Sequence, residues 1–444
     1  MDRMMELARP LPRYTSYPTA PNFRALTEEE KLACLHECPE PLSLYVHIPF
    51  CRKICLYCGC SSLMSRSVEK DEIYVAALIR EIEQARRITG RKKVCEIHFG
   101  GGTPTKLSNM SLERIYRALE DHFEFVPGVA SAIEIDPRTV DRARLQFLRS
   151  LGFNRVSFGV QDFDPAVQEA IGRRQTATEV EENYFSAREV GFGSIHFDLI
   201  YGLPGQSVKS FDATQKKVIE LSPDRISLFS FAYLPHLKLN QRAIPLELLP
   251  KAEEKFAILE AARRAFCDAG YIAIGMDHFA RPGDALARSY QDGTLFRSFQ
   301  GYTSFHAQSL LGFGMTAIGQ TEKSYFQNWK SLEHYYEAIN RGVLPLERGL
   351  FLNSDDLRRR YVIEEIMCRF RVSKSEFRTK FEEEFDRYFE KEKEALNALS
   401  DLIEDSSDSL RVSREGELFL RNIASCFDAY LENNQTNHTF SHSI

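Results

Sequence analysis

Four of the ten cysteines crowd into one short segment, FCRKICLYCGC, at positions 51, 55, 58 and 60. Such crowding favours a metal site. Thiolates on three irons of a cubane [4Fe–4S] cluster leave the fourth iron open to another ligand, much as catalytic metal sites keep an open position. Because the spacing C-x3-C-x2-C supplies three thiolates from one loop, we interpret Cys51, Cys55 and Cys58 as ligands of a [4Fe–4S] cluster.

The open iron defines the chemistry that this segment predicts. It can bind the amino and carboxylate groups of S-adenosylmethionine, and inner-sphere electron transfer to the sulfonium would then release a 5′-deoxyadenosyl radical. Cys60 is interpreted as a bystander, because ligation by it would close the iron that the chemistry needs open.

Structural zinc is the competing interpretation, because Cys60 makes a fourth thiol and zinc sites accept four sulfurs. Zinc sites usually join two pairs of ligands from separated segments, whereas these four cysteines lie within ten residues. The spacing therefore favours the iron–sulfur cluster and leaves zinc as an alternative.

Other candidate residues have a functional and a structural interpretation. The glycines of GGGTPT (100–105) permit close backbone approach to a ligand, although such a segment is more often only a turn. Glu134 and Asp198 lie in apolar strands, where a carboxylate needs either a ligand or an internal ion pair. His47 shares the phase of Tyr45 on the first predicted strand, and a lone histidine there is usually structural.

The segment between residues 42 and 232 alternates short apolar strands with helical stretches, as expected of βα units around a parallel sheet. Near-continuous apolar runs suit strands that are buried on both faces. Six strands are predicted, at 42–48, 94–99, 131–136, 155–160, 194–200 and 225–231. The pattern predicts an α/β fold containing a barrel or partial barrel.

In parallel α/β barrels, reactive groups gather where the strands end, because the βα loops meet there. Each predicted strand is followed by a candidate motif: Cys51 after the first, GGGTPT after the second, Asp136-Pro137 after the third, Gln161 after the fourth and YGLPG after the fifth. The motifs therefore belong on one rim.

Composition shifts along the chain predict four parts. Residues 1–41 are expected to form an arm and a short helix, and residues 42–340 the barrel with an extension. Charged helical segments over 341–430 predict a small, mainly helical domain, for which a winged-helix fold is one candidate. The polar stretch 431–444 is expected to be disordered.

Bulk properties exclude several classes of function. The net charge of −6 gives no general attraction to nucleic acid or to an anionic membrane surface. No apolar run approaches about eighteen residues, and the first residues lack the apolar core of a secretory signal. We expect a cytoplasmic protein with no nucleic-acid or membrane partner.

With these residues in hand, the chain resembles the radical S-adenosylmethionine (SAM) superfamily and, within it, the oxygen-independent coproporphyrinogen III oxidase (coproporphyrinogen dehydrogenase) family. The resemblance rests on motifs spread along nearly the whole chain: PRYTSYPTA (12–20), LYVHIPFC…C…CGC (44–60), HFGGGTPT (98–105), IEIDPR (133–138), GFNRVSFGVQDF (152–163), DLIYGLPGQ (198–206), GMDHFARP (275–282) and FQGYT (299–303).

The resemblance implies a partial (β/α)6 barrel that holds the [4Fe–4S] cluster and two SAM molecules. It implies oxidative decarboxylation of two propionates of coproporphyrinogen III to vinyl groups, giving protoporphyrinogen IX in haem biosynthesis. An electron donor such as a flavodoxin or ferredoxin system would feed the cluster, and we expect a monomer. Haem-binding chaperones with the same barrel are the alternative, although they typically lack both the RYTSYPT arm and a cysteine at the position of Cys60.

The resemblance also assigns residues to sites. The cluster-bound SAM would be contacted by Tyr45, Gly101, Glu134 and Ile318. The second SAM site would be lined by Tyr57, Gly102, Thr103, Gln161, Arg173, Asp198 and Ala232. Tyr45, His47 and Glu134 are the predicted catalytic residues, and Arg13, Arg281 and Arg297 are candidates for the substrate carboxylates, each equally explained as a surface charge.

Overall fold

The computed structural model describes residues 2–305, 307–431 and 440–441, and the chain folds into two compact units. The unit that we call the barrel unit comprises Phe23–Leu249 and Ala307–Phe351. The other, the helical unit, comprises Met1–Asn22, Pro250–His306 and Leu352–Ile444.

Six parallel strands form the centre of the barrel unit, in the order β2-β5-β6-β7-β8-β9. Their bounds are β2 Leu42–Ile48, β5 Lys93–Gly101, β6 Glu124–Ile135, β7 Arg155–Gln161, β8 Ser194–Tyr201 and β9 Arg225–Ser230. All six predicted strands are thereby confirmed, and the α/β class with a parallel sheet is confirmed with them.

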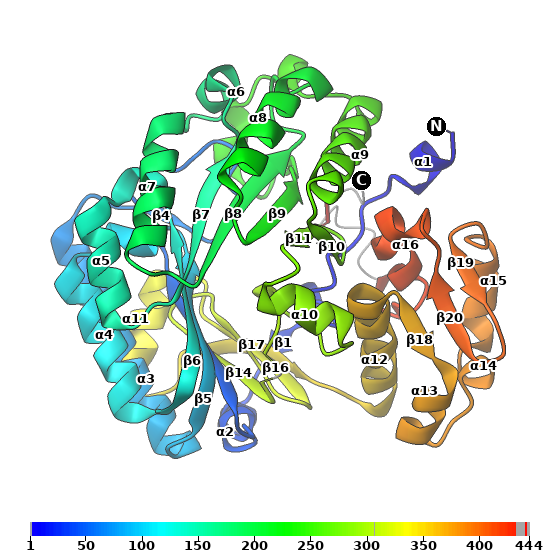
Figure 1. Cartoon of the computed structure of the whole chain (residues 1–444). Helices are drawn as coiled ribbons and strands as arrows, with labels where there is room; N and C mark the ends of the chain where they lie inside the picture. The colour runs from blue at the N-terminus through cyan, green and yellow to red at the C-terminus, as the bar shows by residue number, and fades with distance from the viewer. Residues whose placement is uncertain (1, 306, 432–439, 442–444) are drawn as a thin grey trace. The chain divides into compact units, whose positions relative to one another are not determined.

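A helix follows each of the first five strands and returns the chain to the start of the next one (Figure 1). These helices are α3 Val68–Thr89, α4 Asn109–His122, α5 Arg142–Leu151, α6 Pro165–Ala170 with α7 Ala177–Glu189, and α8 Val208–Leu221. Each is immediately preceded by a serine, threonine or aspartate that caps the helix: its side chain accepts a hydrogen bond from a backbone N–H of the first turn.

An extension continues the sheet beyond β2. Strand β14 (Ser309–Phe313) runs parallel to β2, and the antiparallel strands β15 (Ile318–Gln320), β16 (Ser324–Asn328), β17 (Leu346–Phe351) and β1 (Arg24–Ala25) follow in that order. Helices α2 (Glu28–His36) and α11 (Leu332–Asn340) belong to the same unit. The predicted capping box at Thr27 and Glu30 is confirmed at the start of α2.

The barrel strands bury apolar side chains on one face and bring polar side chains together on the other. On β2, Leu44 and Val46 are fully buried, whereas the intervening Tyr45 and His47 hydrogen-bond to each other. On β5, Ile97 and Phe99 are likewise fully buried, and His98 contacts a carboxylate of the neighbouring strand. The strand period of two thus places the candidate side chains on the polar face.

The helical unit combines helices with two small antiparallel sheets and the antiparallel pair of β10 and β11. Its helices are α1 Asp2–Leu7, α9 Ala252–Asp268, α10 Ala285–Gln291, α12 Ser354–Arg369, α13 Lys374–Phe381, α14 Phe385–Tyr388, α15 Lys393–Asn397 and α16 Leu420–Ser425. Strand β10 (Ile272–Ile274) pairs with β11 (His278–Ala280), and β12 (Phe296–Ser298) pairs with β13 (Gly301–Thr303). The remaining sheet consists of β18 (Arg371–Ser373), β20 (Ser409–Val412) and β19 (Ile403–Asp405).

The sequence predicts charged helices over 374–404 and a last helix that reaches Tyr430. The stretch 374–404 forms three short helices, and the first ends where Glu382 adopts a left-handed conformation (φ 57°). The last helix ends at Ser425 instead of reaching Tyr430, and a local turn follows in which the Asp428 side chain accepts a hydrogen bond from the Tyr430 amide.

The division of the chain also differs from the boundaries 41/42 and 340/341 expected from composition. Residues 250–306 group with the C-terminal segment, because Phe256 stacks near Phe419, with ring centres 6.3 Å apart, and Ile274 and Cys368 share one buried cluster. The predicted disordered stretch 431–444 lies almost wholly outside the described residues, and the winged-helix assignment stays a prediction.

The N-terminal arm is an integral part of the helical unit. Tyr14 and Tyr17 are buried in the same hydrophobic cluster as α12 and α16. The Arg421 guanidinium of α16 donates hydrogen bonds to the carbonyl oxygens of Leu11 and Pro12. These contacts fix the arm, so that the side chain of Arg13 has a defined position.

Within the described part of the chain, no helix is both long enough and apolar enough to span a membrane.

Candidate functional site

The cysteine loop begins at the carboxyl end of the first barrel strand. Short strands β3 (Phe50–Cys51) and β4 (Leu63–Met64) pair with each other and close the loop between them. Cys55 is buried, and Cys51 and Cys58 are half-buried. The Cys51 Sγ lies 3.3 Å from the Thr103 Oγ1, which connects the loop to the turn after β5.

One asparagine holds the backbone of this loop in place. Asn240 Nδ2 lies within hydrogen-bond distance of three loop carbonyl oxygens, those of Cys55 (3.1 Å), Leu56 (3.0 Å) and Cys58 (3.0 Å). Asn240 lies in the 3-10 helix Leu239–Ala243, which follows β9. Its amide therefore fixes the segment that carries two of the three proposed ligands.

We expect Asn240→Ala to weaken retention of an iron–sulfur cluster, because the loop loses these bonds and the carbonyls of two ligand residues are released. A lost hydrogen bond of this kind costs about 1 kcal/mol or more, so we expect cluster loss in the presence of a chelator to be several times faster. Iron per protein, followed over time, measures it. Lys238→Ala is the matched control, because the Lys238 side chain donates to the Cys60 carbonyl (2.9 Å) and not to the carbonyls of Cys55, Leu56 and Cys58 that Asn240 contacts. Equal loss rates for the two variants would contradict the role of Asn240.

Arg173 places a buried positive charge beside the thiols. The residue is 6% exposed, and its Nη1 lies 3.6 Å from the Cys55 Sγ and 3.2 Å from Asp136 Oδ2. Its Nη2 donates to the Gly159 carbonyl at 2.7 Å. The guanidinium therefore connects the cysteine loop to Asp136 and to the end of β7.

The thiol of Cys60 hydrogen-bonds to Cys58, which lowers the pKa of Cys58 to about 6. The two thiols are therefore hydrogen-bonding neighbours in the cysteine loop.

The glycines after β5 allow the backbone to approach the cysteine loop closely. Gly101 has φ +115°, and a Cβ on it would lie 2.7 Å from the His47 ring. A Cβ on Gly102 would lie 2.6 Å from the Pro49 carbonyl oxygen and 3.0 Å from the Cys51 Sγ. A side chain at either position would therefore force the two loops apart.

Tyr45 and His47 connect β2 to the end of the cysteine loop. His47 Nε2 lies 2.9 Å from the Ser61 carbonyl oxygen, which can only accept, so this nitrogen carries the proton. Nδ1 of the neutral ring then accepts from the Tyr45 hydroxyl at 3.0 Å. Burial lowers the pKa of His47, which keeps the imidazole neutral at neutral pH.

Glu134 lies on β6 beside this pair. Its Oε1 is 3.0 Å from His98 Nε2, and its Oε2 accepts a hydrogen bond from the Gly101 amide at 3.2 Å. The ring of His98 stacks on that of Tyr45, with centres 5.9 Å apart. The Glu134 side chain remains 41% exposed, so its carboxylate can still accept a bond from a ligand.

Ile318 is held close to β2, the strand that carries Tyr45. Gly312 pairs in register with Tyr45, and a Cβ on Gly312 would lie 2.6 Å from the Ile318 carbonyl oxygen. The structure therefore gathers the four residues predicted to contact the cluster-bound SAM, namely Tyr45, Gly101, Glu134 and Ile318, around β2, β5 and β6.

Most residues predicted for the second SAM site form a second group. Arg173 Nη2 and Gln161 Nε2 both lie within 3.2 Å of the position that a Gly159 Cβ would take. Gln241 Nε2 donates to the carbonyl oxygens of Tyr57 and Ala232, both at 3.0 Å. Gly102 and Thr103 adjoin Cys51 instead.

Asp198, like Gly102 and Thr103, stands apart from this second group. It accepts a hydrogen bond from the Ser157 hydroxyl at 2.7 Å and lies 3.7 Å from His196 Nε2. Burial raises its pKa to about 6, and the charge of Glu134 adds to the increase. The charge of Asp198 therefore interacts with that of Glu134, which belongs to the first group of residues.

A buried carboxylate on α3 supports the strand that carries His47. Glu81 accepts hydrogen bonds from the Tyr335 hydroxyl (2.6 Å), the Gly314 amide (2.7 Å) and the Asn328 side chain (2.6 Å). Gly314 in turn approaches the His47 carbonyl, because a Cβ on it would lie 2.6 Å from that oxygen. Glu81 is thus a positioning residue for the rim.

Burial raises the pKa of Glu81 to about 7. The folded state then retains a proton that the unfolded state releases above its own pKa of about 4.5. This contribution to stability is complete below about pH 4.5, is lost as the pH rises to about 7, and amounts to at most on the order of 3 kcal/mol. We expect Glu81→Gln to remove this dependence. Urea unfolding of both proteins from pH 5 to 8 measures it, and a constant difference in unfolding free energy between them would contradict it.

The residues around the cysteine loop fit an iron–sulfur cluster. The loop offers three thiols, a guanidinium and a close glycine backbone, as described above. Among the residues that the structure describes, no three His, Cys, Asp or Glu side chains lie close enough to hold a single metal ion. In a [4Fe–4S] cluster each cysteine binds a different iron, so the thiols need not converge on one point.

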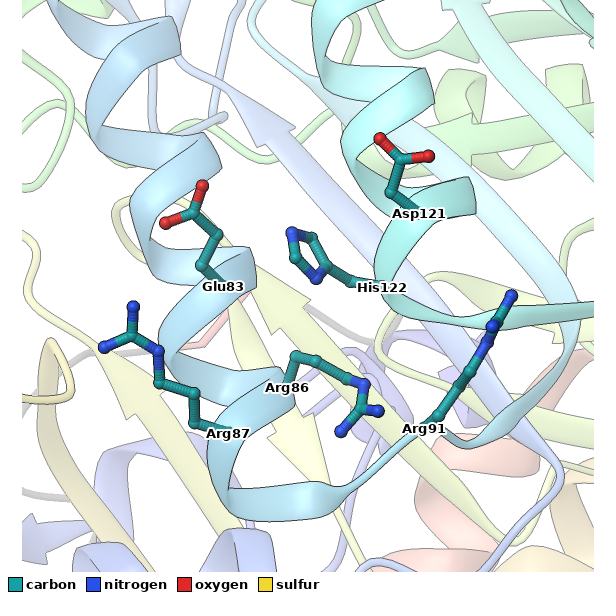
Figure 2. A pocket seen from close by; sticks show the side chains of 6 residues that line it. All are labelled: Glu83, Arg86, Arg87, Arg91, Asp121 and His122. Carbon is teal, nitrogen blue, oxygen red and sulfur yellow. The ribbon is translucent and has the colours of Figure 1, made fainter.

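A pocket of about 380 Å³ lies elsewhere on the barrel unit and is lined by Glu83, Arg86, Arg87, Arg91, Asp121 and His122 (Figure 2). Its residues come from the carboxyl ends of α3 and α4 and from the turn that leads into β5. These segments adjoin the amino ends of the parallel strands, opposite the rim that carries Cys51 and Glu134. The pocket is therefore separate from the candidate site.

Sequence reasoning missed three residues that organise the site. The sequence alone assigns His98 no role of its own. Because His98 and Gly100 are two residues apart on β5, their side positions share one face of the strand, which is the polar face. Asn240 lies in a polar segment without periodicity, and Glu81 lies in a charged helix where nothing marks it as buried.

Comparison with known proteins agrees with this geometry. The model of the radical SAM superfamily matches residues 45–218. The oxygen-independent coproporphyrinogen III oxidases of Synechocystis sp. and Escherichia coli are each 40% identical to the chain, covering 98% of it and 96% of the relative. A solved structure of the coproporphyrinogen III oxidase HemN from E. coli, described as a radical SAM enzyme, matches with a TM-score of 0.91 and 41% identity over 94% of this chain and 97% of that one. The chain therefore belongs to the oxygen-independent coproporphyrinogen III oxidase family of radical SAM enzymes.

Proposed function

We propose that this protein catalyses the oxygen-independent decarboxylation of two propionate side chains of coproporphyrinogen III to vinyl groups, giving protoporphyrinogen IX. Each propionate loses one hydrogen atom from its β-carbon, one CO2 and one electron. The observation that carries the proposal is the cysteine loop, held by Asn240 and Arg173 on the rim that also presents Tyr45 and Glu134. Family membership agrees with it.

Cys51, Cys55 and Cys58 would hold the [4Fe–4S] cluster. With SAM bound, the cluster supplies a 5′-deoxyadenosyl radical that takes hydrogen from the substrate. The contribution of the chain is to hold the reacting groups close together and to keep water away from them. The buried Arg173 and the close contact between Gly102 and Cys51 serve this purpose in the loop.

Tyr45, His47 and Glu134 are proposed to position SAM. Glu134 offers a partly exposed carboxylate to the amino group or ribose of the cofactor, with Gly101 and His98 fixing its orientation. His47 is neutral and donates from Nε2 to the Ser61 carbonyl, so in this arrangement it connects the strand to the cysteine loop.

The proposal includes two SAM molecules. Its support is that the predicted residues separate into a group around Glu134 and another around Arg173, with Tyr57, Gln161 and Ala232 near the latter. Equilibrium dialysis of the reconstituted protein with labelled SAM tests the number. Two molecules per chain are expected, and saturation at one would contradict the second site.

Coproporphyrinogen III and an electron donor such as a flavodoxin or ferredoxin system are the proposed partners. We further propose a monomer that acts in the cytoplasm without nucleic acid or membrane, as the resemblance and the weakly acidic charge of −6 suggest.

The direct test supplies the reconstituted protein anaerobically with a reductant, SAM and coproporphyrinogen III, followed by chromatography of the oxidised porphyrins. We expect tripropionate and then protoporphyrin products. Tight stoichiometric binding of haem without any vinyl-bearing product would instead support a haem-binding chaperone.

A further inference from the structure

The helical unit contains a buried arginine with unused hydrogen-bond donors. Arg297 lies on β12 opposite Tyr302 of β13, and its guanidinium lies 4.3 Å from the centre of the Tyr302 ring. The residue is 5% exposed. Nη2 donates to the Arg13 carbonyl at 3.3 Å, whereas Nε and Nη1, both buried, find no acceptor among the described residues.

The neighbouring carboxylate is already engaged by other groups. Asp277 forms an ion pair with Arg13, and its Oδ1 lies 2.7 Å from His278 Nδ1. Although burial opposes ionisation, His278, Arg13 and Arg297 together hold the pKa of Asp277 well below its ordinary value. Asp277 is therefore ionised, but hydrogen bonds from Arg13 and His278 occupy it.

The local potential is positive. Burial lowers the pKa of Lys255 to about 8, and the charges of Arg421 and Arg13 add to this effect. Arg421 is itself buried and holds the arm that carries Arg13. A lysine that is made more acidic by two guanidinium groups marks a place where an anion is stabilised.

Buried donors without acceptors are costly, and a buried charged group costs more. Proteins retain such a group where a ligand or an ordered water supplies the acceptor. A carboxylate suits a guanidinium better than water does, because it accepts charge-assisted hydrogen bonds from the fork of N–H groups.

We propose that Arg297, with Arg13 beside it, binds a propionate carboxylate of the tetrapyrrole substrate. The inference rests on the proposed function for the identity of the substrate, and it selects among the three arginines that the sequence singled out. Arg281 differs from the other two, because it is exposed and its guanidinium lies 5.9 Å from the Tyr271 ring. It supplies a matched control.

The test measures binding of coproporphyrin III, the stable oxidised form with all four propionates, to the anaerobic holoenzyme by fluorescence anisotropy. Its tetramethyl ester, which lacks the carboxylates, is the second probe. We expect Arg297→Gln to weaken binding of the acid by at least about tenfold and to leave binding of the ester unchanged. Arg297→Lys should retain part of the affinity, and Arg281→Gln should bind both probes as the unsubstituted protein does.

Three further measurements separate this site from a structural role and from the proposed function. The iron content and SAM affinity of Arg297→Gln should equal those of the unsubstituted protein, and addition of coproporphyrin III should raise the unfolding temperature less than in that protein. Unchanged affinity for the acid, or an equal loss for acid and ester, would overturn the site. If the unsubstituted protein forms vinyl product while Arg297→Gln keeps the same KM, only the site is wrong. Failure of the unsubstituted protein to bind the acid or to form product would refute the function and the site together.

Discussion

Replacement of Cys51, Cys55 or Cys58 by alanine is expected to abolish the [4Fe–4S] cluster and to lower the rate of vinyl formation by at least about 10⁴-fold. Under the proposed assignment each thiol would bind its own iron, so that a lost ligand would leave an iron without protein coordination. Iron and sulfide content, visible absorption and product formation after anaerobic reconstitution measure the effect.

Cys60→Ser is the matched control for these substitutions. Cys60 lies two residues beyond Cys58 and hydrogen-bonds to it, and our proposal does not count Cys60 among the ligands. We expect this variant to retain the full iron content. If Cys60→Ser lost the cluster and one of the other three kept it, the ligand assignment would be wrong.

Glu134→Gln is expected to weaken SAM binding and turnover by about tenfold to a hundredfold while iron content stays the same. The substitution keeps the shape of the side chain but removes its charge. In the folded protein the two oxygens of Glu134 contact His98 Nε2 and the Gly101 N–H. The glutamine side chain has only one oxygen, so its NH2 group must face one of these two partners. Equilibrium dialysis with SAM and the initial rate of 5′-deoxyadenosine formation measure it.

Glu124→Gln provides the control on the same strand. Glu124 is the first residue of β6 and is exposed, whereas Glu134 lies near the carboxyl end. The control should behave as the unsubstituted protein. SAM affinity that is equal in Glu134→Gln and Glu124→Gln would remove Glu134 from the site.

The barrel could be predicted from sequence because its strands are continuous apolar runs. β2 spans Leu42–Ile48, the range expected from LSLYVHI. β6 begins at Glu124, earlier than the predicted residue 131. Pro127 and Gly128 interrupt its apolar pattern at an irregularity where Gly128 has φ 75° and the register with β5 shifts. The rim positions of Cys51, Gln161 and the YGLPG segment then followed from strand ends alone.

The two-unit organisation could not be predicted in the same way. Residues 250–306 join the helical unit through contacts with segments about a hundred residues or more away, such as that of Phe256 with Phe419. Local patterns contain no information about such pairs. The roles of Asn240 and Arg297 likewise depend on neighbours that are distant in sequence.

The most direct test of the central claim uses coproporphyrinogen III that carries deuterium at the β-carbons of its propionates. The protein is reconstituted anaerobically and supplied with SAM and a reductant, and 5′-deoxyadenosine is analysed by mass spectrometry beside the porphyrin products. We predict deuterium in 5′-deoxyadenosine in proportion to the vinyl groups formed. Vinyl product without deuterium transfer, or cofactor cleavage without vinyl product from a protein with an intact cluster, would contradict the account.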